Sequence, residues 1–351
     1  CIRDSYYERE VYPATLNRTL APYLARGHLD LPEFGFRVNI NLSADIAGID
    51  RPEGAEAETD ALVTLTRKFG EGATLFHSTR DKESVRREVA AALTQFNEQF
   101  LLSSRSRREA LLQQVSEGSL TEEEVPRDIL TVLLANRADQ DLDDDMILRE
   151  VAFFMQAGSH SSANALTHSF HEIAQWCRRH PADRDRLMTD DHFLQRCIHE
   201  SLRLHPASPV AWRTASEAFS LPDGTDVAEG DSVVIDLMSA NLEAPLFGED
   251  AEQFNPHRAV ANRIPPFGLS FGIGIHTCFG RDIAGGLGDA KTEGEAPHLG
   301  TLTNLLKNLM QHDARPDPAN PAVADAGTER PNWGCYPLII GQQTGATGAA
   351  V

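Results

Sequence analysis

The run Phe271–Gly280, with the sequence FGIGIHTCFG, constrains the fold most strongly, because it places Cys278 in a glycine-rich loop directly before a segment compatible with a helix. Glycines let the backbone approach a large flat ligand and adopt a positive φ, which residues with a Cβ avoid. Phe271 can cover one side of the sulfur. Amide groups of a tight loop and the positive end of a helix starting near Phe279 would keep the cysteine charged as a thiolate. This setting predicts a metal-bound thiolate.

The same run fits the pattern FxxGxxxCxG at every fixed position and resembles the cysteine-ligand loop of the cytochrome P-450 family, the haem-thiolate monooxygenases. Other segments in the same order extend the resemblance from about Tyr12 to about Ile340. The resemblance implies a mainly α fold with small β-sheets. It also implies haem b, with Cys278 as the axial iron ligand. The residues implied to line the haem in this loop are Phe271, Gly272, Gly274 and Gly280.

A second motif, Glu200-Ser201-Leu202-Arg203, lies in an apolar-periodic segment from Phe193 to Leu204 that ends before Pro206. A Glu and an Arg three positions apart share one helical face and can pair. Such a pair alone is weak evidence, since most are solvated surface pairs. Its position before Phe254–Arg258 resembles the family's helix pair and the arginine that joins it. Glu200, Arg203 and Arg258 are therefore expected to form a structural triad that supports the loop.

Arg213 and His276 resemble positions that contact the haem propionates in the family, because a cation or a donor pairs with a carboxylate. The alternative is a surface arginine and a loop histidine. His276 and Cys278 could also suggest a zinc site. However, the sequence has no Cys-x-x-Cys motif or pair of histidines at the spacing that would complete the zinc ligands.

One long helix is predicted from about Asp145 to about Arg179, opened by acidic residues and closed by Pro181. Its centre resembles the family's oxygen-activation helix, in which a small residue and a glycine, here Ala157 and Gly158, open a groove over the haem. The following acid and alcohol positions hold His160 and Ser161. This departs from the family pattern. Histidine titrates near neutral pH and could relay protons, and serine keeps a hydroxyl, whereas the alternative is that His160 only hydrogen-bonds across a polar pocket or caps a loop.

The remaining pattern predicts mostly helices, followed by a small antiparallel sheet. The sheet is expected to combine Phe219–Leu221, a turn at Pro222–Gly224, and Ser232–Leu237. A stretch rich in Gly, Glu and Ala, from Gly285 to Gly300, indicates an insertion or a broken helix before a helical pattern at Leu302–Met310. Other helices are expected at Val11–Arg26, Asn41–Ile49, Glu58–Thr66, Asp81–Gln113 and Glu122–Asn136. We expect a single domain over residues 1–340 and a disordered tail over 341–351.

Composition limits the classes of partner that the protein can bind. The net charge of −20 over 351 residues disfavours nucleic acid, and no stretch is apolar enough to span a bilayer. Five scattered cysteines and no signal peptide favour reduced thiols. The protein is expected to be cytoplasmic and a monomer. On the family resemblance, Arg258, Arg263 and Arg281 would form a basic face for an acidic ferredoxin. The alternative is separate arginines in structural pairs.

The resemblance implies a monooxygenase that inserts one oxygen atom from O₂ into a small apolar organic substrate. Electrons would come from NAD(P)H through a ferredoxin-type partner. Two haem-based alternatives are a peroxide-using peroxygenase and a haem-binding remnant without turnover. Since the chain opens at Cys1 and its first residues resemble the end of an internal helix of the family, an N-terminal portion is expected to be missing.

A rival from another class is a serine hydrolase, because Gly268-Leu269-Ser270-Phe271-Gly272 matches GxSxG. The nucleophile elbow needs a buried strand before the serine and a helix directly after it. Ile264-Pro265-Pro266 before it and Gly272-Ile273-Gly274 after it argue against this context.

Overall fold

A computed structural model describes residues 6–75, 78, 80–261, 263–287, 298–326 and 330–341. The chain divides into two compact units: unit 1 comprises Cys1–Asn164 with His312–Val351, and unit 2 comprises Ala165–Gln311. Both are built mainly of helices with short antiparallel strands, which confirms the predicted mainly α class with small β-sheets. The expectation of a single domain over 1–340 stays a prediction, and the tail predicted at 341–351 lies outside the described residues apart from Gly341.

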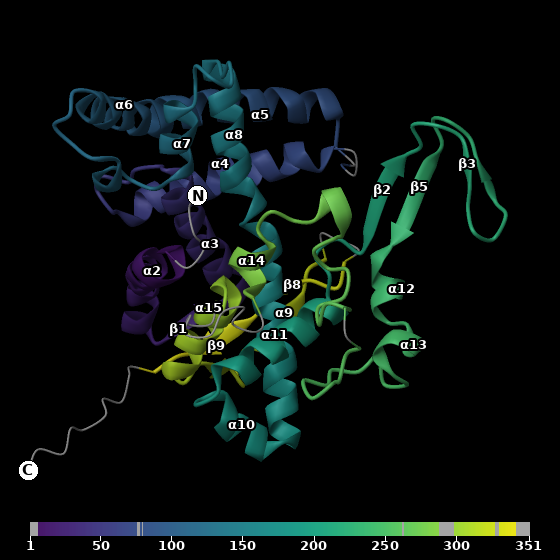
Figure 1. Ribbon diagram of the computed structural model, residues 1–351. Helices are drawn as coiled ribbons and strands as arrows, with labels where there is room; N and C mark the ends of the chain where they lie inside the picture. The colour runs from purple at the N-terminus through teal and green to yellow at the C-terminus, as the bar shows by residue number, and fades with distance from the viewer. Residues whose placement is uncertain are drawn as a thin grey trace, which may run out of the picture. The chain divides into compact units, whose positions relative to one another are not determined.

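Unit 1 is a set of helices around one apolar core, accompanied by short strands near the C-terminus (Figure 1). Its elements are η1 (Tyr7–Val11), α2 (Tyr12–Arg26), β1 (His28–Asp30), α3 (Leu31–Ala47), α4 (Glu56–Ala73), α5 (Lys82–Phe96), η3 (Asn97–Leu101), α6 (Leu102–Ser116), η4 (Glu122–Glu124), α7 (Ile129–Ala135), α8 (Asp144–Ala157), the start of α9 (His160–Arg179), β6 (Arg315–Pro316), β7 (Val323–Ala324), β8 (Trp333–Cys335) and β9 (Pro337–Ile339). Strands β1, β9 and β6 form an antiparallel sheet in that order, and β7 pairs with β8.

The core of unit 1 forms where α3, α4, α5 and α8 bury their apolar faces. Ile40, Leu62, Phe96 and Val151 are fully buried there. Each such side chain contributes roughly 1.5–3 kcal/mol by leaving water. The core therefore holds α8, and with it the residues that follow at its C-terminal end.

The helices predicted at Val11–Arg26 and Asp81–Gln113 are present, whereas two other predictions differ. Helix α3 begins ten residues before the predicted start at Asn41; twelve of its seventeen residues are buried and none is exposed, so no polar face revealed the period in the sequence. The helix predicted over Glu122–Asn136 is divided into η4 and α7. Pro126 lacks an N–H and forces Val125 into an extended conformation.

The single helix predicted over Asp145–Arg179 is also wrong, because α8 and α9 are separated at Gly158 and Ser159. The Ser159 hydroxyl donates to the Met155 carbonyl at 2.6 Å, and its amide donates to Gln156 instead of continuing the α-helical pattern. A side-chain hydroxyl that bonds to the preceding turn competes with the helical hydrogen bonds and interrupts them. The interruption lies directly before His160.

Unit 2 contains the rest of α9, further helices and two strand pairs. Its elements are α10 (Pro181–Leu187), α11 (Asp191–Leu204), β2 (Val210–Thr214), β3 (Phe219–Ser220), β4 (Asp226–Val227), β5 (Ser232–Asp236), α12 (Leu237–Asn241), α13 (Ala244–Phe247), η5 (Gly274–His276), α14 (Arg281–Gly285) and α15 (Thr301–Gln311). Strands β2 and β5 lie side by side as a ribbon that continues into α12 (Figure 1).

The predicted pairing within this sheet is wrong. The turn at Pro222–Gly224 closes a short hairpin in which β3 pairs with β4. Strand β5 pairs instead with β2, from Val210 opposite Asp236 to Thr214 opposite Ser232. Two five-residue strands form more ladder hydrogen bonds than the two-residue β3 can offer, so the longer partner determines the pairing.

The helix that follows the cysteine loop is short, and most of the insertion or broken helix predicted over Gly285–Gly300 lies outside the described residues. Helix α14 ends at Gly285, and residues 288–297 lie outside the described part. The two sides of this gap meet, because the Leu287 amide donates to the His298 carbonyl at 2.9 Å and the Thr301 hydroxyl donates to the Ile283 carbonyl at 3.0 Å. Helix α15 covers the predicted Leu302–Met310 pattern.

Candidate haem-thiolate site

Helix α11 supplies the buried polar groups on which the cysteine loop is built. The Asp190 carboxylate accepts from the Phe193 amide at 2.9 Å and caps the N-terminus of the helix. Apolar side chains anchor the helix, while five polar side chains are buried with it: Gln195, His199, Glu200, Ser201 and Arg203. Buried polar groups are costly unless they are hydrogen-bonded, so their partners define what the helix holds.

The Glu200 carboxylate binds both arginines expected to join it. Arg203 donates to both carboxylate oxygens, Nε to Oε2 and Nη2 to Oε1, each at 2.8 Å. Arg258 Nε donates to Oε1 at 3.0 Å, and the Asn255 amide donates to the same oxygen at 3.1 Å. The side chains of Glu200, Arg203 and Arg258 are each at most 4% exposed. The structure thus brings the three residues together, while their supporting role stays a prediction.

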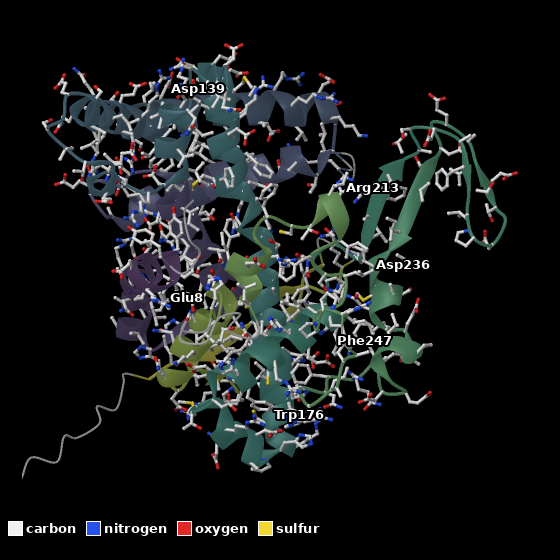
Figure 2. The ribbon with its side chains drawn as sticks, viewed as in Figure 1. Glu8, Asp139, Trp176, Arg213, Asp236 and Phe247 are labelled. Atoms are coloured by element: carbon white, nitrogen blue, oxygen red, sulfur yellow. The ribbon has the colours of Figure 1, made fainter. Side chains whose placement is uncertain are left out.

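Both guanidinium groups also bind main-chain carbonyls of the segment that precedes the loop. Arg203 Nη1 donates to the carbonyls of Asn241 and Ala251, each at 2.7 Å, and the guanidinium lies 5.0 Å from the Phe247 ring centroid. Figure 2 labels Phe247 at the end of α13. Arg258 donates to the carboxylate of Asp250 and to main-chain carbonyls nearby. The two arginines of the triad are thereby hydrogen-bonded to the chain between α12 and the loop.

Side-chain contacts remove two of the three arginines, Arg258, Arg263 and Arg281, from the expected basic face. Arg258 is buried in the triad, and Arg281 donates to Asp282 at 2.7 Å. Arg263 is exposed at a positive φ of 79°. The alternative of arginines in structural pairs therefore describes two of the three positions.

The loop that carries Cys278 is closed by main-chain hydrogen bonds and made possible by glycines. The Cys278 amide donates to the Phe271 carbonyl at 2.8 Å, and the Gly272 amide donates to Leu269 at the same distance. Gly272 has φ 67°, and a Cβ there would lie 2.9 Å from the His276 carbonyl oxygen. A Cβ at Gly280 would lie 3.9 Å from Cys278 Sγ. The following helix α14 begins at Arg281, two residues later than expected.

The loop presents an exposed, apolar surface around an exposed thiol. Cys278 is a free, exposed cysteine. Ile275 is 96% exposed and Phe279 is 100% exposed. Large apolar side chains that are so exposed within one short loop mark a surface that binds another apolar group. The Phe271 ring instead packs edge-on against Phe267, with the centroids 5.0 Å apart.

The donor set around Cys278 fits haem and does not fit zinc. A structural or catalytic zinc needs three or four protein ligands. Among the described residues, no group of three or more His, Cys, Asp or Glu side chains could hold a metal ion. Haem iron needs a single thiolate from the protein, with apolar contacts to its flat ring, and the residues of this loop can supply both.

The two side chains predicted to bind carboxylates are available for that role. Arg213, on strand β2, donates to the carbonyl of Trp212 at 2.7 Å and forms no ion pair with a described residue. Figure 2 shows it on the β2–β5 ribbon. His276 is exposed at the end of η5. Whether either residue contacts haem stays a prediction.

The residues predicted for oxygen activation lie at the break between α8 and α9, in unit 1. The His160 ring packs edge-on against Phe36 at 4.9 Å between centroids, although part of the residue is exposed. Desolvation and the nearby Arg67 guanidinium lower the pKa of His160, so the ring is neutral at pH 7. The Ser161 hydroxyl donates to the Ala157 carbonyl at 3.2 Å, across the break that contains Gly158.

Two buried residues of α11, which the sequence analysis missed, bind the chain at the end of α14, the helix that follows the loop. Gln195 Nε2 lies 3.1–3.2 Å from the carbonyl oxygens of Gly285, His298 and Leu299. His199 Nε2 lies 2.8 Å from the Gly285 oxygen. Burial lowers the pKa of His199, so the ring is neutral and Nε2 donates. Polar residues four positions apart in an apolar-periodic helix were the signal that could have identified them.

The serine of the GxSxG match, Ser270, forms structural hydrogen bonds and is not placed as a nucleophile. Ser270 donates its hydroxyl to the Leu202 carbonyl at 2.6 Å and accepts from Asn241 Nδ2 at 3.1 Å. Residues 266–271 are turns, with no strand directly before Ser270 and no helix directly after it. The hydroxyl has no histidine partner among its described contacts, so the triad geometry that a hydrolase requires is not built here.

Known proteins match the chain on both sequence and structure. The family model "Cytochrome P450" matches residues 74–285, which include the triad and the cysteine loop. Rat cytochrome P-450 4F4 is 27% identical over 251 residues, covering 64% of this chain and 44% of the relative. Cytochrome P-450 704C1 of Pinus taeda is 35% identical over 105 residues, covering 28% of this chain and 20% of the relative. The chain thus spans less than half the length of these curated relatives.

Solved structures share the fold. CYP109E1 from Bacillus megaterium, in complex with corticosterone, superposes with a TM-score of 0.69 at 18% identity, covering 96% of this chain and 79% of that one. Cytochrome P-450 TbtJ1 superposes with a TM-score of 0.68 at 19% identity, covering 97% of this chain and 78% of that one. The family-model match covers more than half of the sequence and includes the only cysteine that stands in a ligand motif. The chain belongs to the cytochrome P-450 family.

Proposed function

We propose that this chain carries the catalytic core of a haem-thiolate monooxygenase that inserts one oxygen atom from O₂ into a small apolar organic substrate. The observation that carries the proposal is the free, exposed Cys278 in a glycine loop, with an apolar surface beside it and a buried ion-pair network behind it. Loop, network and family membership point to the same chemistry.

Cys278 would be the axial ligand, and haem b, when bound, would supply iron-centred activation of O₂. Gly272, Gly274 and Gly280 would allow the loop to approach the flat ring, with Phe271 beside them. Arg213 and His276 would bind the propionates, since neither has a carboxylate partner among the described residues. Ala157 and Gly158 would leave space for oxygen at the break after α8.

His160 and Ser161 would move protons. A neutral imidazole can accept a proton from water and pass it on, and the lowered pKa keeps His160 in that neutral form at pH 7. The Ser161 hydroxyl, which donates to Ala157, keeps two lone pairs to accept a hydrogen bond. On this proposal, Ser161→Ala uncouples electron consumption from product formation, while Ser161→Thr keeps both coupled.

The electrons would come from NAD(P)H through a ferredoxin-type donor. Of the three arginines expected to form a basic face, Arg258 is buried and Arg281 is paired with Asp282. Arg263 is exposed and could contact such a partner. We place the protein in the cytoplasm, a setting supported by the four described cysteines, none of which forms a disulfide, and we propose that it is a monomer. A member of the same fold was solved with a steroid, which makes steroid-sized apolar molecules a first substrate panel.

The test is turnover of the haem-reconstituted full chain under two electron supplies. Product formed with NADH, ferredoxin and ferredoxin reductase, and lost in Cys278→Ala, supports the monooxygenase. Product formed with peroxide alone supports a peroxygenase, and haem binding with no turnover supports a remnant. Covalent labelling of Ser270 by a fluorophosphonate would support the hydrolase instead.

A further inference from the structure

The start of the cysteine loop is tied to the triad by one side-chain amide, that of Asn241. This residue ends helix α12 and is 0% exposed. Its Nδ2 group donates to the Arg203 carbonyl at 3.0 Å and to the Ser270 hydroxyl at 3.1 Å, while Oδ1 accepts from the Leu269 amide at 2.7 Å. Its own main-chain carbonyl accepts from Arg203 Nη1. Every polar atom of the side chain is used.

The contact is built by both partners. Gly268 lies so close that a Cβ there would be 2.2 Å from Asn241 Oδ1, and its φ of 58° favours glycine. Ser270 completes the link by donating to the carbonyl of Leu202, next to Arg203. An amide with two donors and one acceptor matches this arrangement of two acceptors and one donor, whereas a carboxylate or a hydroxyl does not.

The link leads to the sulfur through two main-chain hydrogen bonds. The Leu269 carbonyl accepts from Gly272, and the Phe271 carbonyl accepts from Cys278, both at 2.8 Å. Residues 269–272 are therefore hydrogen-bonded to Asn241 at one end and to Cys278 at the other. Moving the Leu269 amide moves the carbonyl that orients the cysteine.

We propose that Asn241 is a positioning residue for the thiolate: it transmits the fixed geometry of the Glu200–Arg203 pair to Cys278 and so holds the sulfur in the orientation that ligates haem iron. This inference rests on the proposed haem-thiolate function. Asn241 itself contacts neither haem nor substrate in this role.

The test compares Asn241→Asp with wild type and with a matched control, Asn136→Asp. The Asp side chain keeps an acceptor for the Leu269 amide but turns an oxygen towards the Arg203 carbonyl and the Ser270 hydroxyl. Asn136 also donates to a main-chain carbonyl, that of Val132 at 2.8 Å, but it is exposed at the end of α7. Its carboxylate variant therefore stays hydrated and leaves the loop untouched.

Two readouts separate the positioning role from general damage. The first needs no haem: hydrogen exchange at the Leu269 amide should be about tenfold faster in Asn241→Asp, because losing roughly one of the hydrogen bonds that Nδ2 donates to Arg203 and Ser270 lets this segment open more often. The second is the spectrum of the haem-loaded, reduced and carbon monoxide-bound protein. Part of the red-shifted Soret band of thiolate ligation should convert to an unshifted band in Asn241→Asp but not in Asn136→Asp.

Since a buried carboxylate could unfold the chain, Ser270→Ala provides a milder version of the same perturbation. It removes one acceptor of Asn241 and the bond to Leu202, and should convert a smaller fraction of the red-shifted band. Unchanged band ratios in both Asn241→Asp and Ser270→Ala would overturn the inference and leave the proposed function intact. A wild-type protein that takes up haem without any red-shifted band would overturn the proposed function and this inference with it.

Discussion

Glu200→Gln should destabilise the protein strongly, because it removes the one carboxylate that both buried arginines share. The substitution keeps the shape of the side chain and deletes its charge. Arg203, which is 0% exposed, would keep its carbonyl acceptors but lose both hydrogen bonds to a charged partner. Arg258 would lose one such bond and keep Asp250.

The expected magnitude follows from the burial of these charges. Removing one partner of a buried ion pair costs about 3–5 kcal/mol. Since the glutamine oxygen can still accept one hydrogen bond, we expect the lower end, about 3 kcal/mol, or roughly a 100-fold change in the unfolding equilibrium. This is a large share of the roughly 5–15 kcal/mol that stabilises an ordinary domain.

The assay is urea unfolding of the full chain followed by far-UV circular dichroism. Glu217→Gln is the matched control, because Glu217 is exposed and forms no ion pair with a described residue. Hydrogen exchange within α11 would show whether the loss is local to the triad. A Glu200→Gln variant that stays within about 0.5 kcal/mol of wild type, like a surface substitution, would show that the shared carboxylate does not stabilise the two buried arginines.

Two further predictions concern α11 and the loop. Burial lowers the pKa of His199, so below about pH 6.5 the unfolded chain protonates this imidazole more readily than the folded protein does, and the free energy of unfolding should fall as the pH falls. His199→Gln, which can still donate to the Gly285 carbonyl, should show a smaller fall between about pH 7.5 and about pH 5.5 in urea titrations. Equal falls in the two proteins would contradict the neutral form assigned to His199. In thermal melts, Gly268→Ala should lower the stability more than Gly224→Ala does. Both positions have a positive φ, which costs a residue with a Cβ about 1–2 kcal/mol, but only position 268 places the new Cβ against Asn241. Equal losses of stability would argue against the close contact between Gly268 and Asn241.

Local sequence patterns predicted the parts of the site whose partners are close in the chain. The glycines and cysteine of the Phe271–Gly280 loop determine each other's geometry over ten residues. Glu200 and Arg203 meet because three positions nearly complete a helical turn. The assignment of Arg258 to the same carboxylate, 58 residues away, rested on resemblance, since spacing alone does not bring such distant residues together.

The residues that were missed act over long sequence separations. Asn241 binds Leu269 and Ser270, and Gln195 binds carbonyls about 90–104 positions away. An amide side chain looks the same in sequence whether it is solvated or fully bonded in a core, so nothing local marked Asn241, and only the spacing of Gln195 and His199 in an apolar-periodic helix offered a local signal. The pairing of β2 with β5 was missed for a related reason: the turn at Pro222–Gly224 was visible, while β2 and β5 are separated in the chain by the β3–β4 hairpin that this turn closes.

The most direct test of the account is the absorption spectrum of the haem-reconstituted chain, reduced under carbon monoxide, for wild type and Cys278→Ala. We predict a strongly red-shifted Soret band in wild type that is absent from Cys278→Ala. A red-shifted band that persists in Cys278→Ala, or haem uptake by wild type without that band, would contradict ligation by Cys278.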